Sequence, residues 1–206
     1  MTPLVGAKWR WWVVALLCLW LFIGMVREVR AAGILGNIES LQGNFSQEIV
    51  NSKGAVTAKS LGVFALLKPH FFRWQIVEPG RQLLISDGTF FWQHDEDLET
   101  VIRRPLEGQL NSPLGVLLAD EGVLKEHYNL ARSPGALTLT PIESNAMFTS
   151  MKVSFIQEVP TEVIVTDNLD QRIRFTLTAA PSTLLSAADF VFIQPAGADI
   201  TIVNPE

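Results

Sequence analysis

Cysteine and histidine, which carry much of the covalent and metal chemistry of proteins, are scarce in this sequence of 206 residues. The single cysteine, Cys18, lies inside an apolar run near the start of the chain. The three histidines, His70, His94 and His127, are scattered and fit no metal-ligand spacing. The sequence also has no Gly-x-Ser-x-Gly motif, no phosphate-binding loop and no dinucleotide fingerprint. These absences predict a protein that is not an enzyme and uses no metal or cofactor.

Basic residues are also in the minority, with 16 Lys and Arg against 21 Asp and Glu. Two of them, Lys8 and Arg10, precede a 16-residue apolar run at 11–26, and small residues follow near Ala31. This order is typical of a secretory signal peptide. We therefore assign residues 1–32 to a signal peptide and residues 33–206 to one domain. The alternative is an uncleaved anchor, but the run would span only roughly 24 Å as a helix.

Loss of the signal peptide would change both the cysteine content and the charge of the chain. Cys18 would be removed with the signal peptide, so the mature chain would form no disulfide. Four basic residues and one acidic residue would also leave, so that 12 basic and 20 acidic residues remain, a net charge of −8. An acidic domain is a poor candidate for binding nucleic acid or an anionic membrane surface. We therefore expect an exported, soluble protein that binds no nucleic acid.

Residues 68–104 are predicted to form three consecutive antiparallel strands. Residues 71–77 alternate between apolar and polar side chains, and a turn follows at 78–81. Asp87-Gly88 is the signal for a two-residue hairpin, which would pair Ile85 with Phe90. The large apolar side chains are expected on one face of this sheet: Phe72, Trp74, Ile76, Leu83, Ile85, Phe90 and Trp92.

The rest of the chain is predicted to be mainly β. A short amphipathic helix is expected at Ile34–Leu41, and a bulge at Gly62 is expected in a long strand at 55–67. Helices are predicted from Pro113 and at 121–127, with a helical turn within 182–188. Further strands are expected at 44–50, 98–103, 128–132, 137–140, 150–156, 163–166, 172–178, 190–193 and 200–203. Strands at this spacing favour one large antiparallel sheet that curls into a barrel, with the helices at its mouth.

The apolar face of the central strands has two interpretations. It can be an ordinary packed core, or it can be the wall of a ligand cavity. Large, grouped aromatic residues and an apolar helix with Leu114 and Leu117, which looks like a lid, favour the cavity, because a wide barrel is poorly filled by side chains alone.

The sequence resembles the periplasmic outer-membrane lipoprotein carrier family, LolA. The residues that carry the resemblance are Lys68-Pro69-x-x-Phe72-x-Trp74, Pro79, Ser86-Asp87-Gly88 and Trp92-x-x-Asp95-x-Asp97-Leu98-Glu99-x-Val101. It extends from Leu41-x-x-x-Phe45-x-Gln47 to Phe190-x-Phe192-x-x-Pro195-x-Gly197 and so covers nearly the whole mature chain.

The resemblance implies a single incomplete β-barrel with a helical lid over an apolar cavity. The cavity residues would be Leu41, Phe45, Phe72, Trp74, Ile76, Leu83, Ile85, Phe90, Trp92, Leu114 and Leu117. In the family an arginine before the proline ties the lid shut. This sequence has Lys68 there, and lysine lacks the planar fork of arginine, so the latch is expected to be weaker or different.

The resemblance also implies partners. Such a carrier is a monomer that accepts acylated lipoproteins from an inner-membrane lipoprotein-releasing ABC transporter and delivers them to an outer-membrane receptor lipoprotein. Two other hypotheses stay open. The same scaffold can carry another lipid or a polyene, a hypothesis suggested by Lys68 standing where the family has arginine. It can also be a lipid-sensing regulatory domain.

Overall fold

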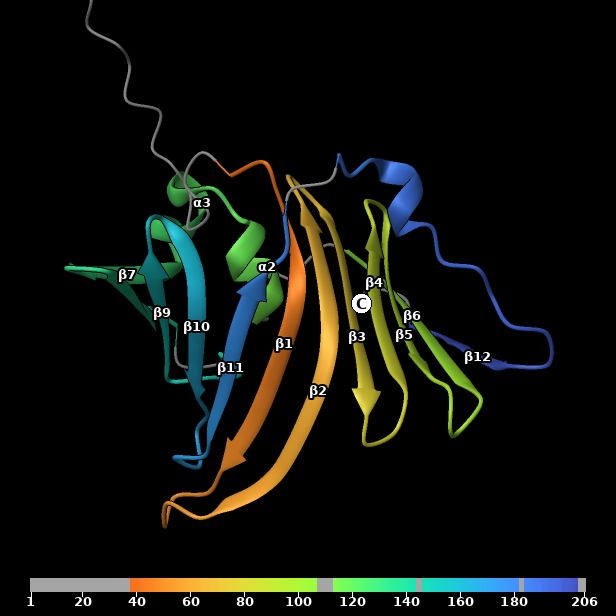
Figure 1. The fold of residues 1–206 in the computed structure, drawn as a ribbon, viewed down its shortest axis with the longest axis horizontal. Coiled ribbons are helices and arrows are strands. Elements are labelled where there is room, and N and C mark those ends of the chain that lie inside the picture. Colours follow the sequence, from red (N-terminus) through yellow and green to blue (C-terminus); the bar gives the residue numbers. More distant parts are fainter. Residues whose placement is uncertain (1–37, 107–112, 144–145, 182–183, 204–206) are drawn as a thin grey trace, which may run out of the picture. The chain divides into compact units, whose positions relative to one another are not determined.

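The computed structural model describes residues 38–106, 113–143, 146–181 and 184–203. Nearly all described elements are strands, as Figure 1 shows. Their bounds are β1 (Ser40–Val50), β2 (Val56–Leu67), β3 (Phe71–Glu78), β4 (Gln82–Asp87), β5 (Phe90–Asp95), β6 (Thr100–Pro105), α2 (Pro113–Leu118), α3 (Glu121–His127), β7 (Tyr128–Ser133), β8 (Ala136–Pro141), β9 (Ser150–Ile156), β10 (Val159–Thr166), β11 (Arg172–Ala179), the 3-10 helix η2 (Ala187–Phe190) and β12 (Asp199–Ile202).

All described strands belong to one sheet with the order β12-β6-β5-β4-β3-β2-β1-β11-β10-β9-β8-β7. Because β12 and β7 form its two ends, the sheet is open, and the predicted incomplete barrel is confirmed. Neighbouring strands are antiparallel, except that β12 runs parallel to β6. Sequential strands therefore form two meanders, and β1 joins them by pairing with both β2 and β11.

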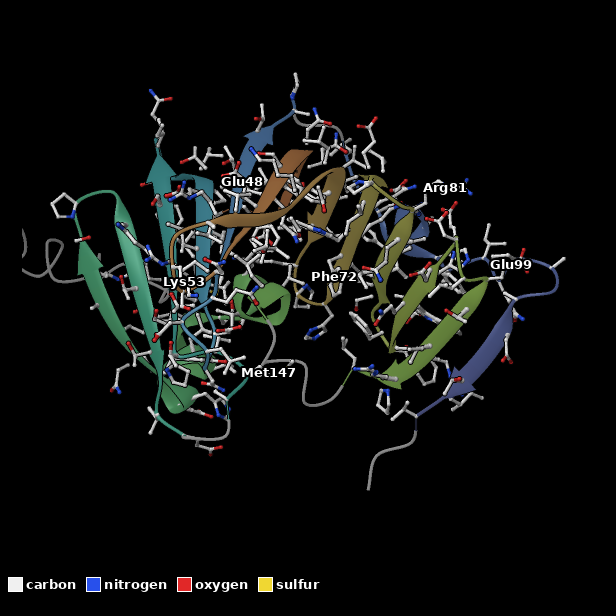
Figure 2. The ribbon with its side chains drawn as sticks, turned by 90° about the horizontal axis from the view of Figure 1, so that it is seen from below. Glu48, Lys53, Phe72, Arg81, Glu99 and Met147 are labelled. Atoms are coloured by element: carbon white, nitrogen blue, oxygen red, sulfur yellow. The ribbon has the colours of Figure 1, made fainter. Side chains whose placement is uncertain are left out.

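The sheet is strongly curved, and α2 lies inside the curve (Figure 2). We call the face toward α2 and α3 the inner face. The opposite face is the outer face, and η2 contacts it at β3 and β4. A strand with both faces covered is expected to lose strict alternation, and β4 does so with Leu83-Leu84-Ile85.

The predicted bulge at Gly62 is confirmed, because the register of β2 with β3 shifts between Leu61 and Gly62. The predicted helix at 34–41 is wrong at its end: β1 begins at Ser40, while residues 34–37 lie outside the described residues. The predicted strand at 190–193 is also wrong, because η2 ends at Phe190 and residues 191–193 join no strand.

The predicted register of the β4–β5 hairpin is wrong as well. Ile85 pairs with Trp92 and not with Phe90. The carboxylate of Asp87 accepts the backbone N–H groups of Thr89 and Phe90 at 2.9 and 2.7 Å, and so it holds the turn one residue later than expected. Gly88 adopts φ +89°, which is unfavourable for residues with a side chain.

Candidate functional site

The inner face is built on an aromatic cluster that joins β1, β2, β3 and β11. The rings of Phe45 and Trp74 stack, with centroids 3.9 Å apart and an interplanar angle of 25°. Phe45 pairs with Gly62, where a Cβ would lie 2.4 Å from the Phe45 ring and 2.1 Å from a backbone oxygen of β3. Glycine is therefore required for this close approach. Trp74 also contacts Phe64 at 5.8 Å and the edge of Phe175 at 5.3 Å.

Helix α2 belongs to the same buried cluster as these inner-face residues. Val116, Leu117 and Leu118 are 0, 3 and 6% exposed and belong to the same apolar core as Phe45 and Trp74. Their side chains have no hydrogen-bonding atoms, so these three residues hold to the sheet by non-directional apolar contact. Replacing that contact with another apolar surface would break no side-chain hydrogen bond of these residues.

Six of the predicted cavity residues are brought together in this core or against it. They are Leu41, Phe45, Phe72, Trp74, Ile76 and Leu117. Phe72 contacts Phe91 of β5 at 5.7 Å between ring centroids, and Leu41 and Ile76 are half-buried. Leu114 lies in α2, but its side chain is outside the described part of the structure. The contact of these residues with lipid stays a prediction.

Four predicted cavity residues lie on the outer face, so their expected place beside Trp74 is wrong: Leu83, Ile85, Phe90 and Trp92. Ile76 pairs with Gln82, five residues intervening, and directly paired residues share a face. Because side chains alternate along β4, Leu83 and Ile85 point to the opposite face. Leu84 pairs with Trp74 and is therefore the apolar residue of β4 that faces inward.

Two of these outer-face residues, Phe90 and Trp92, belong to a second cluster that includes the C-terminal segment 184–203. The ring of Trp92 stacks on Phe192 with centroids 4.7 Å apart, and its Nε1–H donates to Asp87 at 2.7 Å. The Arg103 guanidinium lies 4.5 Å above the Phe90 ring, a cation–π contact. Phe190 is 0% exposed and contacts Phe71 at 5.7 Å. This cluster is held by directional contacts, unlike the cover that α2 provides.

The sequence reasoning missed the part of the inner face that β8–β11 supply. The buried side chains there are Leu137, Leu139, Met151, Val153, Val163, Val165 and Leu177. Alternation in these strands was visible, but it does not show that β11 pairs with β1 and so places Leu177 opposite Phe45. Strand order is a long-range property that a periodic pattern does not contain.

Helix α3 is tied to the neighbouring strand by charge. Glu121 forms ion pairs with Lys125, at 2.8 Å, and with Arg132 of β7. The hydrogen bond from Lys125, and with it the charges of Arg132 and Lys125, lowers the pKa of Glu121 despite partial burial. After α3, Tyr128 stacks on Phe148 at 5.8 Å, and burial raises the pKa of its hydroxyl.

The acidic residues 95–97 lie at the end of β5 and in the turn that follows it. Glu96 pairs with Arg81 at 3.0 Å, Asp97 accepts the Arg81 backbone N–H at 3.2 Å, and Asp95 accepts that of Leu98 at 3.0 Å. No cluster of three or more potential metal ligands was found among the described residues. In the same part of the chain, no helix has the length and apolar character needed to cross a bilayer.

Residues 36–193 match the sequence model of the family described as outer membrane lipoprotein carrier protein LolA. The chain belongs to the LolA family. An outer-membrane lipoprotein carrier protein of Alkalilimnicola ehrlichii is 32% identical over 167 residues, covering 80% of this chain and 78% of that protein. The corresponding protein of Xanthomonas axonopodis pv. citri is 32% identical over 172 residues, covering 79% and 82%.

A solved structure also shares the LolA fold. A LolA superfamily protein of Nitrosomonas europaea superposes with a TM-score of 0.51 at 14% identity, covering 79% of this chain and 94% of that one. At that identity the likeness concerns the fold alone.

Lys68, the predicted LolA latch residue, directly follows the last residue of β2. Its backbone N–H donates to the carbonyl oxygen of Glu39 at 2.9 Å, so the end of β2 is bonded to the residue just before β1. The role of its ammonium group in holding a lid stays a prediction.

Proposed function

We propose that this chain is a periplasmic carrier that shields the acyl chains of lipoproteins on its inner face and moves them from the inner to the outer membrane. Membership of a family named for lipoprotein carriers supports this role. The observation that carries the proposal is the apolar core shared by α2 and the inner face, in which Val116, Leu117 and Leu118 contribute only aliphatic side chains.

The physics of transfer favours such a cover. Each methylene removed from water contributes about 0.8 kcal/mol, so three long acyl chains cannot cross an aqueous space unshielded. A membrane offers nearly the same gain, and a carrier must therefore bind its cargo without trapping it. When an acyl chain displaces α2, one apolar contact replaces another, and the net free energy of the exchange is small. Delivery then depends on small differences in affinity.

The proposal includes the expected partners and location. The leader at residues 1–32 directs export, and the mature domain at 33–206 works as a monomer without enzymatic activity. It accepts acylated lipoproteins from an inner-membrane lipoprotein-releasing ABC transporter and gives them to an outer-membrane receptor lipoprotein. The net charge of −8 supports this role, because an acidic carrier is repelled by anionic membrane surfaces during transit.

Depletion in the bacterium that makes this protein tests the carrier function. We expect lipoproteins to accumulate at the inner membrane when the protein is withdrawn, as measured by membrane fractionation. We also expect protein isolated from native periplasm to carry acylated polypeptide detectable by mass spectrometry. Normal delivery of lipoproteins after depletion would contradict the proposal.

A further inference from the structure

The inner face changes character from β3 toward the β6 end of the sheet. Gln82 on β4 pairs with Ile76, Gln93 on β5 pairs with Leu84, and Arg104 on β6 pairs with Phe91. Each of the three polar residues shares the inner face with its apolar partner, because directly opposed residues point to the same side. We call Gln82, Gln93 and Arg104 the polar stripe.

The polar stripe runs diagonally across three neighbouring strands. Gln82 lies directly opposite Asp95, two positions from Gln93, and Gln93 lies opposite Ile102, two positions from Arg104. Diagonal neighbours on a sheet are about 7 Å apart, so the stripe is roughly 14 Å long. Extended peptide advances about 3.3 Å per residue, so the stripe matches about four residues.

The exposure of the stripe differs from that of the aromatic cluster. Gln82 and Gln93 are half-buried and Arg104 is exposed, whereas Phe45 and Trp74 are buried. Within the described ranges, the two side-chain amides have no hydrogen-bond partner and the guanidinium has no ion pair. A half-buried amide without a protein partner is costly to cover with hydrocarbon.

The chemistry of the stripe fits a peptide and not an acyl chain. A carboxamide donates and accepts, as a peptide group does, and a guanidinium donates to carbonyl or carboxylate oxygens. We propose that the polar stripe binds the polypeptide segment that follows the acylated N-terminus of the cargo. This inference rests on the proposed carrier function. The acyl chains lie on the Phe45–Trp74 part of the inner face, and the peptide leaves across β4, β5 and β6.

Two probes separate this subsite from acyl binding. One is a synthetic triacylated lipopeptide with six residues after its acylated cysteine; the other is the same triacylated cysteine as a simple amide without further residues. The test variant is Gln82→Leu/Gln93→Leu. The control is Gln75→Leu, which alters a half-buried glutamine on the opposite face of β3. Affinities are measured by isothermal titration, and folding is checked by circular dichroism.

We expect the double variant to bind the lipopeptide about tenfold more weakly than the wild type, since each lost hydrogen bond contributes modestly. Its affinity for the peptide-free lipid should change less than about twofold, and the control should change neither. Arg104→Gln, an exposed change that leaves the fold intact, should give a smaller loss in the same direction and replaces the double variant if that variant does not fold.

The other outcomes overturn the inference in distinguishable ways. Equal weakening for both probes would place the glutamines against the lipid anchor, and unchanged affinities would show that the stripe contacts no cargo. If the wild-type protein binds neither probe, the carrier function itself fails, and the stripe has no cargo to bind.

Discussion

Replacing Leu117 with alanine tests whether α2 is a cover that cargo displaces. The Leu117 side chain is 3% exposed and belongs to the core beneath α2. Truncating a buried leucine to alanine costs about 2–5 kcal/mol. If α2 leaves the inner face when an acyl chain binds, this cost falls on the free protein and not on the loaded one.

Leu117→Ala should therefore lower the stability of the free protein and raise its affinity for lipid. The free protein should lose about 2–5 kcal/mol of unfolding free energy, which lowers Tm by about 4 °C or more for a domain of this size. The loaded protein should lose much less. Because the covered state competes with lipid, the same energy difference raises the apparent affinity for a triacylated lipopeptide by at least about thirtyfold while the covered state dominates.

Ile85→Ala provides the control. Ile85 is 0% exposed, but it lies on strand β4 with its side chain on the outer face, away from α2 and from the proposed acyl site. Its substitution should destabilise free and loaded protein alike and leave affinity unchanged. Thermal unfolding followed by circular dichroism, with and without lipopeptide, measures both variants. If Leu117→Ala behaved like the control, α2 would be a fixed part of the core, and displacement by cargo would be wrong.

Two further predictions concern polar groups. Asp87→Ala should lower the free energy of unfolding by about 2–3 kcal/mol, because three N–H donors, including Nε1 of Trp92, lose their acceptor. Urea unfolding should show a smaller loss for Asp87→Asn. Equal losses for the two variants would contradict the assigned hydrogen bonds. The hydrogen bond from Lys125 and the charge of Arg132 lower the pKa of Glu121 from its ordinary value of 4.5. Ionised Glu121 therefore stabilises the fold above pH 4.5, and this contribution is lost as the pH falls through the lowered pKa. Glu121→Gln should therefore reduce stability at pH 7 and flatten its decline in acid, and parallel pH profiles would exclude this contribution.

Local patterns predicted the elements that depend on near neighbours. The strand at Ser150–Ile156 and the helix at Glu121–His127 have the expected bounds, because alternation and helical spacing are properties of the segment itself. The bulge at Gly62 was also predictable, since a glycine inside a strand is typical of a bend. Features that depend on distant segments were not predictable. These are the strand order, the parallel pairing of β6 with β12 and the pairing of Leu177 with Phe45.

The faces of β4 and β5 were assigned wrongly for a specific reason. Which side chains point inward depends on whether the connection from β3 has an odd or even number of residues, and turn residues such as Pro79-Gly80 fit either number. One signal was present in the sequence. The run Leu83-Leu84-Ile85 does not alternate, which indicates a strand covered on both faces. Its outer cover, Phe190 and Phe192, lies about a hundred residues later in the chain.

The two apolar clusters are held in different ways, and this difference predicts which one opens. On the outer face, the C-terminal segment is held by the stack of Phe192 on Trp92 and by the backbone hydrogen bonds of β12 with β6, so moving the segment breaks hydrogen bonds that lipid does not replace. On the inner face, the described side chains of α2 are aliphatic, and an acyl chain replaces their contacts in kind. We therefore predict that cargo competes with α2 on the inner face, while the outer cluster keeps β3–β6 in place as a fixed wall during loading.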